Sequence, residues 1–124
     1  MRDDWKEQRR QGLGGSDSPV VLNKSPWKSR QELWGEKLGF RKESEPSPAM
    51  KRGTIMEPLI ADMYQKVTNR KLKIIKEIQQ HPKYSWMIGS LDRLVEDSEK
   101  GLGVLEIKSP GLKSYGNIER NGVP

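Results

Sequence analysis

Two short segments, Gly89-Ser90-Leu91-Asp92 and Leu105-Glu106-Ile107-Lys108, decide the fold that we predict for this chain. Between them lies Asp97-Ser98-Glu99-Lys100-Gly101, whose composition is typical of a turn. We therefore predict that the two segments end the arms of an antiparallel hairpin. Pairing about the centre of that turn places Asp92 opposite Glu106, and such partners share one face of a hairpin.

The spacing of these residues suggests a metal-dependent hydrolytic site. Side chains repeat with period two on a strand, so Lys108 shares the face of Glu106. Asp92 and Glu106 could together hold one hard divalent cation, with the backbone carbonyl of Ile107 as a further oxygen ligand. Lys108 could hold or deprotonate the attacking water and stabilise charge on a phosphate. Taken alone, however, a Glu-x-Lys strand is usually a solvated face with weak ion pairs, so these residues leave nuclease as one candidate among several.

Composition limits the function classes further. The 124 residues are 32% charged and 32% hydrophobic, which predicts one small domain, residues 1–124, with a thin core. No apolar run is long enough for a membrane span, and we expect neither a secretory signal nor a membrane partner. The absence of cysteine excludes disulfides and thiolate metal sites, and we expect a cytoplasmic location. The net charge of +6 favours an anionic partner, first of all nucleic acid.

The remaining sequence predicts helices followed by strands. Capping and periodicity predict helices at 3–10, from Ser16 or Asp17 to about 22, from 29 to about 37 and from 47 to 68, the last kinked or restarted near Glu57 by Pro58. The predicted strands are 71–78, 86–96 and one within 101–109. We expect no closing element in the tail, residues 111–124. We expect the four tryptophans to be core or packing residues more often than stacking platforms.

Several ordered segments together resemble a known nuclease family. The Asp92 and Glu106-Ile107-Lys108 pair is similar to the PD-(D/E)XK signature. The wider layout resembles the YqaJ-type viral recombinase family, which is phage lambda exonuclease-like. The further matching segments are Trp5 to Arg9 followed by Gly14-Gly15-Ser16-Asp17, Lys51 to Pro58, His81-Pro82 and Ser109-Pro110.

The resemblance implies a fold, an activity and a set of site residues. The fold would be an α/β PD-(D/E)XK core, with N-terminal helices packed on a small mixed or antiparallel sheet. The activity would be Mg²⁺-dependent hydrolysis of linear double-stranded DNA from a 5′-phosphorylated end, with Mn²⁺ as an alternative ion. Asp92, Glu106 and the Ile107 carbonyl would bind the metal and Lys108 would serve the water. Glu57 would complete the acidic cluster. The DNA 5′-phosphate would bind to Arg9, Ser16 and Ser90, whose guanidinium and hydroxyl groups suit phosphate oxygens.

Two departures from the family pattern modify these expectations. Arg93 follows the metal-binding aspartate where many members have glycine, and strand alternation predicts that it points away from the metal face. The family continues beyond a segment like Asn121-Gly122-Val123-Pro124, so we expect an N-terminal portion of a longer nuclease, with weak or absent activity by itself. Expected partners are double-stranded DNA ends, a single-strand annealing protein and, for the full-length protein, further copies in a ring.

Two other functions remain open from the sequence. One is a non-catalytic nucleic-acid-binding fragment that uses the same basic surface without turnover. Such a binder would tolerate the loss of Glu106 or Lys108 and would lose affinity steeply with salt. The other is an endonuclease of the same fold, which would cut closed circular DNA.

Overall fold

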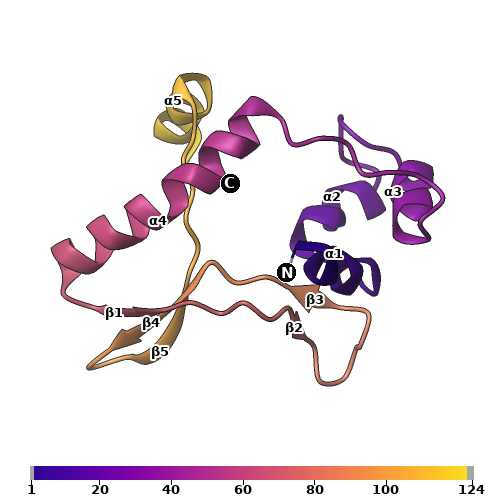
Figure 1. Ribbon diagram of the computed structural model, residues 1–124. Helices are drawn as coiled ribbons and strands as arrows, with labels where there is room; N and C mark the ends of the chain where they lie inside the picture. Colours follow the sequence, from indigo (N-terminus) through magenta and orange to yellow (C-terminus); the bar gives the residue numbers. More distant parts are fainter. Residues whose placement is uncertain (1, 123–124) are drawn as a thin grey trace. The chain divides into compact units, whose positions relative to one another are not determined.

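The computed structural model describes residues 2–122 and shows a mixed α/β protein (Figure 1). Its elements are α1 (Arg2–Arg10), the 3₁₀ turn η1 (Gly15–Asp17), α2 (Ser18–Val21), α3 (Arg30–Lys37), α4 (Pro48–Thr68), β1 (Lys71–Lys73), β2 (Gln79–Gln80), β3 (Ile88–Gly89), β4 (Arg93–Asp97), β5 (Gly101–Leu105) and α5 (Leu112–Asn121). The chain forms two compact units. Unit 1 comprises Met1–Ser44 and Ile75–Leu91, and unit 2 comprises Glu45–Ile74 and Asp92–Pro124.

Helix α3 in unit 1 begins and ends as its sequence predicts. Ser29 accepts a hydrogen bond from the Glu32 N–H, and the Glu32 carboxylate accepts one from the Ser29 N–H, which completes a capping box. After α3, Gly39 adopts a φ of +77°, a left-handed conformation that costs glycine little. The predicted helix at residues 29–37 is therefore confirmed to within one residue.

A close backbone approach joins the loop after α1 to the loop before β3, both in unit 1. Leu13 forms a parallel bridge with Met87, with hydrogen bonds to the backbone of Trp86 and Ile88. A Cβ atom on Gly12 would lie 2.7 Å from the Trp86 carbonyl oxygen. Glycine is therefore needed at position 12 for steric reasons rather than for its φ angle.

Unit 2 is built from α4, α5 and a three-stranded antiparallel sheet in the order β1-β4-β5. Ser47 caps α4 by accepting a hydrogen bond from the Met50 N–H, and α4 ends at Asn69, which has a φ of +55°. The helix passes through Pro58 as one element, so no restart occurs near Glu57. The pairing of β1 with β4 and of β4 with β5 confirms the predicted hairpin (Figure 1).

The strands are shorter than the sequence predicts, and the boundary between the units explains two of the differences. The run 71–78 pairs only at 71–73, because the chain passes from unit 2 to unit 1 at Ile75. The run 86–96 divides into β3 and β4, because the chain passes back between Leu91 and Asp92. The third strand stops at Leu105, so Glu106, Ile107 and Lys108 follow the ladder rather than belong to it.

The expectation that the tail lacks a closing element is wrong, because α5 spans Leu112–Asn121. Leu112, Tyr115 and Ile118 recur every three residues within it, but Gly116 and Asn117 have low helix propensity and weaken the signal. The residues that follow, Val123 and Pro124, lie outside the described part of the chain.

Of the expectation that the tryptophans are core or packing residues, the core part is wrong. The buried apolar residues in the described part of the chain are Val20, Leu33 and Ala61, each 5–6% exposed. Trp27 is 91% exposed, and the other three tryptophans are exposed as well. They have neighbours all the same, since Trp34 lies 5.8 Å from Phe40 and Trp86 lies 6.2 Å from Tyr84, measured between ring centroids. Five apolar residues recur at helical spacing along α4. Met56 and Ile60 are half-buried, while Leu59, Met63 and Val67 are exposed.

No helix in the described part of the chain has the length and apolar character needed to cross a membrane.

Candidate active site

The first pair of candidate residues stands where the β4–β5 ladder ends, in unit 2. The last paired residues are Arg93 and Leu105, so the next position in register places Asp92 opposite Glu106, as the sequence predicts. The Asp92 Oδ2 accepts a hydrogen bond of 2.7 Å from the backbone N–H of Ile107. The Asp92 side chain thus takes the place of the backbone hydrogen bond that a longer strand would make. The same bond holds Asp92 beside the backbone of the Glu106-Ile107-Lys108 segment.

Lys108 is held by Glu106. The Lys108 ammonium forms an ion pair and hydrogen bond with the Glu106 carboxylate, and both side chains are exposed. The hydrogen bond that Lys108 donates to Glu106 raises the pKa of Lys108 above its ordinary value, and the negative charges of Glu106 and Asp92 add to the effect. Lys108 therefore carries a proton at neutral pH, which suits it to hold water or phosphate oxygens rather than to abstract a proton.

Glu57, in the middle of α4, faces Arg93 at the start of β4. Arg93 Nη1 lies 2.7 Å from Glu57 Oε1, and the same nitrogen donates to the Asp92 carbonyl oxygen at 2.5 Å. Strand alternation predicts that Arg93 points away from the metal face. That expectation needs correction, because the long side chain reaches the carboxylate that would complete the acidic cluster.

An open hollow in unit 2 collects part of the predicted site. Glu57, Asp92, Ile107 and Lys108 line it, and so do five residues outside the predicted site, Ala49, Met50, Gly53, Thr54 and Ser109. Helix spacing could have identified Met50, Gly53 and Thr54, since they lie seven, four and three positions before Glu57 on the same face. Glu106 does not line this hollow. A second hollow, at the end of α4 and the β4–β5 turn, contains the Arg70–Asp97 ion pair and none of the candidate residues.

The donor set suits one divalent ion better than a larger cluster. Asp92, Glu106 and the Ile107 carbonyl are hard oxygen donors of the kind that Mg²⁺ and Mn²⁺ take. In residues 4–122, however, no three acidic or histidine side chains are gathered closely enough to hold a metal. Each carboxylate already has a partner, namely the Ile107 N–H for Asp92, Lys108 for Glu106 and Arg93 for Glu57. Asp92 and Glu106 suit such an ion once Lys108 releases Glu106. Arg93 contacts only Oε1 of Glu57, so the part of Glu57 in the acidic cluster stays a prediction.

The predicted 5′-phosphate residues belong to unit 1 and are only partly brought together. Arg9 Nη2 donates to the Ser16 hydroxyl at 3.2 Å, and its guanidinium carbon lies 4.9 Å from the centre of the Trp5 ring. Ser90 is exposed after β3, and its side chain makes no hydrogen bond with the described residues. The sequence analysis places Trp5 and Arg9 in one motif but does not predict this contact between the two side chains.

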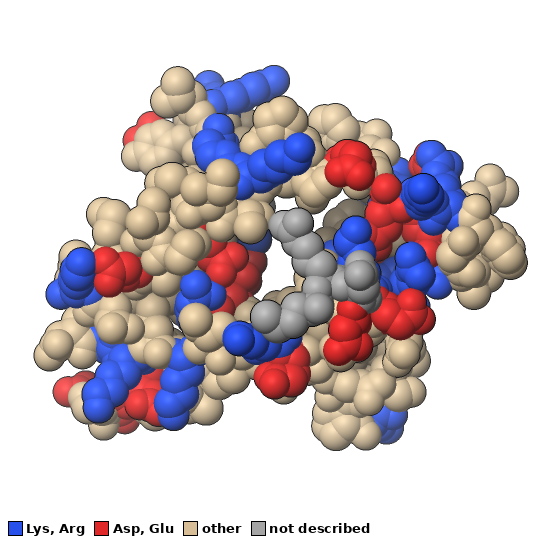
Figure 2. Space-filling model, in the orientation of Figure 1, with Lys and Arg blue, Asp and Glu red and all other residues tan. Residues whose placement is uncertain are grey.

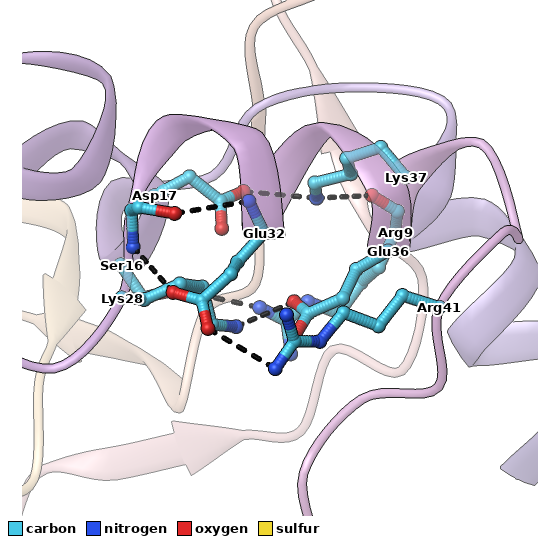
Figure 3. A network of polar contacts seen from close by, with 9 residues as sticks. Arg9, Ser16, Asp17, Lys28, Glu32, Glu36, Lys37 and Arg41 are labelled. Carbon is cyan, nitrogen blue, oxygen red and sulfur yellow. Dashed lines mark hydrogen bonds and ion pairs between the residues drawn. The ribbon is translucent and has the colours of Figure 1, made fainter.

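A dense polar network surrounds this Arg9–Ser16 pair (Figure 3). Lys37 lies 2.9 Å from Asp17 Oδ2 and donates to the Arg9 carbonyl oxygen at 2.8 Å. Asp17 also accepts a hydrogen bond from the Gly14 N–H, so it organises the turn that carries Ser16. In the same network Lys28 pairs with the buried Glu36 at 2.5 Å. The Lys37–Asp17 pair therefore connects the backbone of Arg9 to the turn that carries Ser16.

Comparison with known proteins identifies the family of the chain. Residues 4–124 match the YqaJ-like viral recombinase domain. The chain belongs to the YqaJ-like viral recombinase domain family. The uncharacterized protein YqaJ of Bacillus subtilis (strain 168) is 31% identical over 124 residues, which are 99% of this chain and 38% of that protein.

Solved structures extend the likeness to nucleases. A crystal structure of LHK-Exo in complex with dAMP has a TM-score of 0.76 and 28% identity, covering 98% of this chain and 60% of that one. The alkaline exonuclease LHK-Exo from Laribacter hongkongensis, in another crystal structure, has a TM-score of 0.73 and 27% identity, with the same coverage. The YqaJ-like chain thus has a mixed α/β exonuclease fold, and it spans less than two thirds of these relatives' lengths.

In the YqaJ-like chain, basic side chains also gather on unit 2. Blue side chains lie over α5 and the beginning of α4 in Figure 2. The basic residues of these two segments, Lys51, Arg52, Lys113 and Arg120, are all exposed. On β1, Lys73 forms an ion pair with Glu96 of β4. Lys51 and Arg52 are therefore exposed cations on α4, whereas the charge of Lys73 is balanced within the sheet.

Proposed function

We propose that this protein is a metal-dependent DNA exonuclease of the phage recombination type, which hydrolyses linear double-stranded DNA from 5′-phosphorylated ends. The observation that carries the proposal is the grouping of Asp92, the Ile107 backbone and Lys108 around one open hollow in unit 2. The similarity to an alkaline exonuclease supports the reaction type. Mg²⁺ is the proposed ion, with Mn²⁺ as an alternative.

In the proposed mechanism the chain's own residues bind and orient the scissile phosphate. Asp92 and Glu106 would hold the ion, which when bound supplies Lewis-acid activation of water and phosphate oxygens. Lys108 leaves Glu106 and donates its ammonium hydrogens to a phosphate oxygen, since a lysine with its ordinary pKa of 10.5 is still charged at neutral pH. The ion pair with Glu106 is exposed, so opening it costs little free energy.

End selectivity would come from unit 1. Arg9 can make bidentate contacts to a terminal 5′ phosphate, and the hydroxyls of Ser16 and Ser90 add neutral donors. The Arg9 guanidinium already has a hydroxyl partner in Ser16, so the two groups are positioned for a shared anion. We include double-stranded DNA ends, a single-strand annealing protein and a homo-oligomeric ring as proposed partners of the full-length protein.

The test is digestion of linear duplex DNA by the 124-residue chain with Mg²⁺, using 5′-phosphorylated, 5′-hydroxyl and closed circular substrates. Because the chain is part of a longer nuclease we expect only weak degradation, of the phosphorylated linear DNA alone, with a loss of about 100-fold or more in Lys108→Ala. Lys73→Ala is the matched control, since it removes another Lys–Glu pair of the same unit. Intact linear DNA in every sample would overturn the proposal for this chain.

The alternative, a non-catalytic nucleic-acid-binding fragment, rests on the exposed basic residues of α4 and α5. Fluorescence anisotropy with labelled duplex separates the two. A binder keeps its affinity in Lys108→Ala and Glu106→Ala and weakens steeply with salt. Cutting of closed circular DNA would instead indicate an endonuclease.

A further inference from the structure

Trp27 is the most exposed tryptophan of the chain, in the loop between α2 and α3 of unit 1. It is 91% exposed, although tryptophan is on average a largely buried residue in folded proteins. Trp34 and Trp86 each lie beside another aromatic ring, and the Trp5 ring lies against a guanidinium. The Trp27 ring is instead open to solvent, so it is available to a binding partner.

The loop that carries Trp27 is fastened to unit 1 on both sides of the ring. Before it, the Ser25 N–H donates to the Pro19 carbonyl oxygen at 3.0 Å. After it, the Lys28 ammonium pairs with the buried Glu36 at 2.5 Å (Figure 3). Because the backbone is already held, a ligand that contacts the indole pays little conformational entropy to order it.

The segment that carries Trp27 contains only positive charges. No acidic residue occurs from position 18 to position 31, whereas Lys24, Lys28 and Arg30 all lie in this range. Lys24 and Arg30 are exposed, and the Nε of Arg30 donates to a backbone carbonyl oxygen at 2.7 Å, which fixes its guanidinium. An open aromatic ring flanked by cations is typical of surfaces that bind single-stranded nucleic acid, where rings stack on bases and cations contact phosphates.

The chemistry of stacking favours an unpaired strand over a duplex. Bases inside a duplex already stack on each other, so a ring fixed on a protein surface reaches the face of a base only where that base is unpaired. We propose that Trp27 is a stacking platform for a base of single-stranded DNA, with Lys24 and Arg30 at the neighbouring phosphates. The inference goes beyond the proposed reaction, because it uses none of the residues proposed for hydrolysis and needs no metal.

Fluorescence anisotropy of the full chain with labelled oligo(dT), measured in EDTA to prevent hydrolysis, tests the platform. Trp27→Ala should weaken binding about tenfold, the loss expected for one stacked base, and Trp27→Phe should keep most of the affinity. The matched control is Trp34→Ala, which removes another exposed tryptophan of unit 1 and should change the affinity by less than about threefold. Wild-type affinity in Trp27→Ala would rule out the platform.

An abasic strand of the same length separates stacking from charge, since it keeps the phosphates and lacks the bases. The wild type should bind it about tenfold more weakly than oligo(dT), and Trp27→Ala should distinguish the two strands much less. Equal affinity of the wild type for both strands would overturn the inference. Because the ring is exposed, Trp27→Ala should unfold at the wild-type urea midpoint, so that weaker binding does not reflect loss of the fold.

The inference and the proposed function fail in different ways. Binding of oligo(dT) that depends on Trp27, without digestion of duplex DNA in Mg²⁺, supports the inference and not the nuclease. Digestion with no effect of Trp27→Ala on strand binding supports the nuclease and not the inference. A loss of self-association in Trp27→Ala, seen by sedimentation velocity with the oligo(dT) affinity unchanged, would assign the ring to a contact between copies of the chain and overturn the inference.

Discussion

The Asp92 carboxylate accepts a hydrogen bond from the Ile107 N–H at the point where strand pairing between β4 and β5 has just ended. Asp92 is thus a structural cap of the hairpin as well as the expected metal ligand. A carboxylate has two oxygens, and the contact with Ile107 uses only Oδ2. The same side chain can therefore serve stability and chemistry at once.

Asp92→Ala should destabilise the end of the hairpin by about 1–3 kcal/mol, because the Ile107 N–H loses its acceptor. Asp92→Asn should cost less, since its carbonyl oxygen can still accept that bond. Amide hydrogen exchange at Ile107 measures the difference, with faster exchange expected in the alanine variant. Equal exchange rates in the two variants would show that the bond does not hold the segment.

Glu106→Gln should lower the pKa of Lys108 toward its ordinary value of 10.5, because the hydrogen bond and charge of Glu106 raise it. NMR of the Lys108 side chain across a pH series measures the shift. Since folding raises this pKa, the pair stabilises the fold fully below the ordinary value, and its contribution is lost as pH rises through the higher folded value. At 76% exposure for Lys108 that contribution should not exceed about 1 kcal/mol. A Lys108 pKa unchanged in Glu106→Gln would contradict the pairing.

Gly12→Ala should destabilise unit 1 by about 1–3 kcal/mol through overpacking. The added Cβ would lie 2.7 Å from the Trp86 carbonyl oxygen and 2.8 Å from Ile88 Cγ2. All four tryptophans belong to unit 1, so their fluorescence in urea follows the unfolding of that unit. Gly15→Ala is the control, because a methyl group added there would have nothing within 4 Å. Similar urea midpoints for the two variants would refute the close approach.

Asp17→Ala should destabilise unit 1 by about 3 kcal/mol, since it leaves Lys37 without its counter-charge in a largely buried position. The Lys37 and Asp17 side chains are 17% and 9% exposed, and Asp17 also accepts the Gly14 N–H. Asp17→Asn can still accept that backbone bond, so it should recover part of the loss. Tryptophan fluorescence in urea measures both variants, and a wild-type midpoint in Asp17→Ala would contradict a structural role for the pair.

Much of the candidate site was predictable because it depends on local pairing. A turn at 97–101 and period-two alternation are enough to set Asp92 opposite Glu106 and to place Lys108 with Glu106. The strand lengths were not predictable in the same way. The runs 71–78 and 86–96 have the composition of continuous strands, but each crosses between two compact units and can pair with only one partner sheet at a time.

The sequence by itself determined the family motif, the helix caps at Ser29 and Ser47 and the hairpin register, because each depends on residues a few positions apart. Only the tertiary structure decided that Arg93 pairs with Glu57, which lies 36 positions away on α4. Strand alternation fixes only the direction of the Cα–Cβ bond. The guanidinium of a long arginine side chain takes its position from a nearby carboxylate, because a buried charge needs a counter-charge. The position of the Arg93 charge beside Glu57 therefore depends on the packing of α4 against β4, and no local sequence pattern predicts that packing.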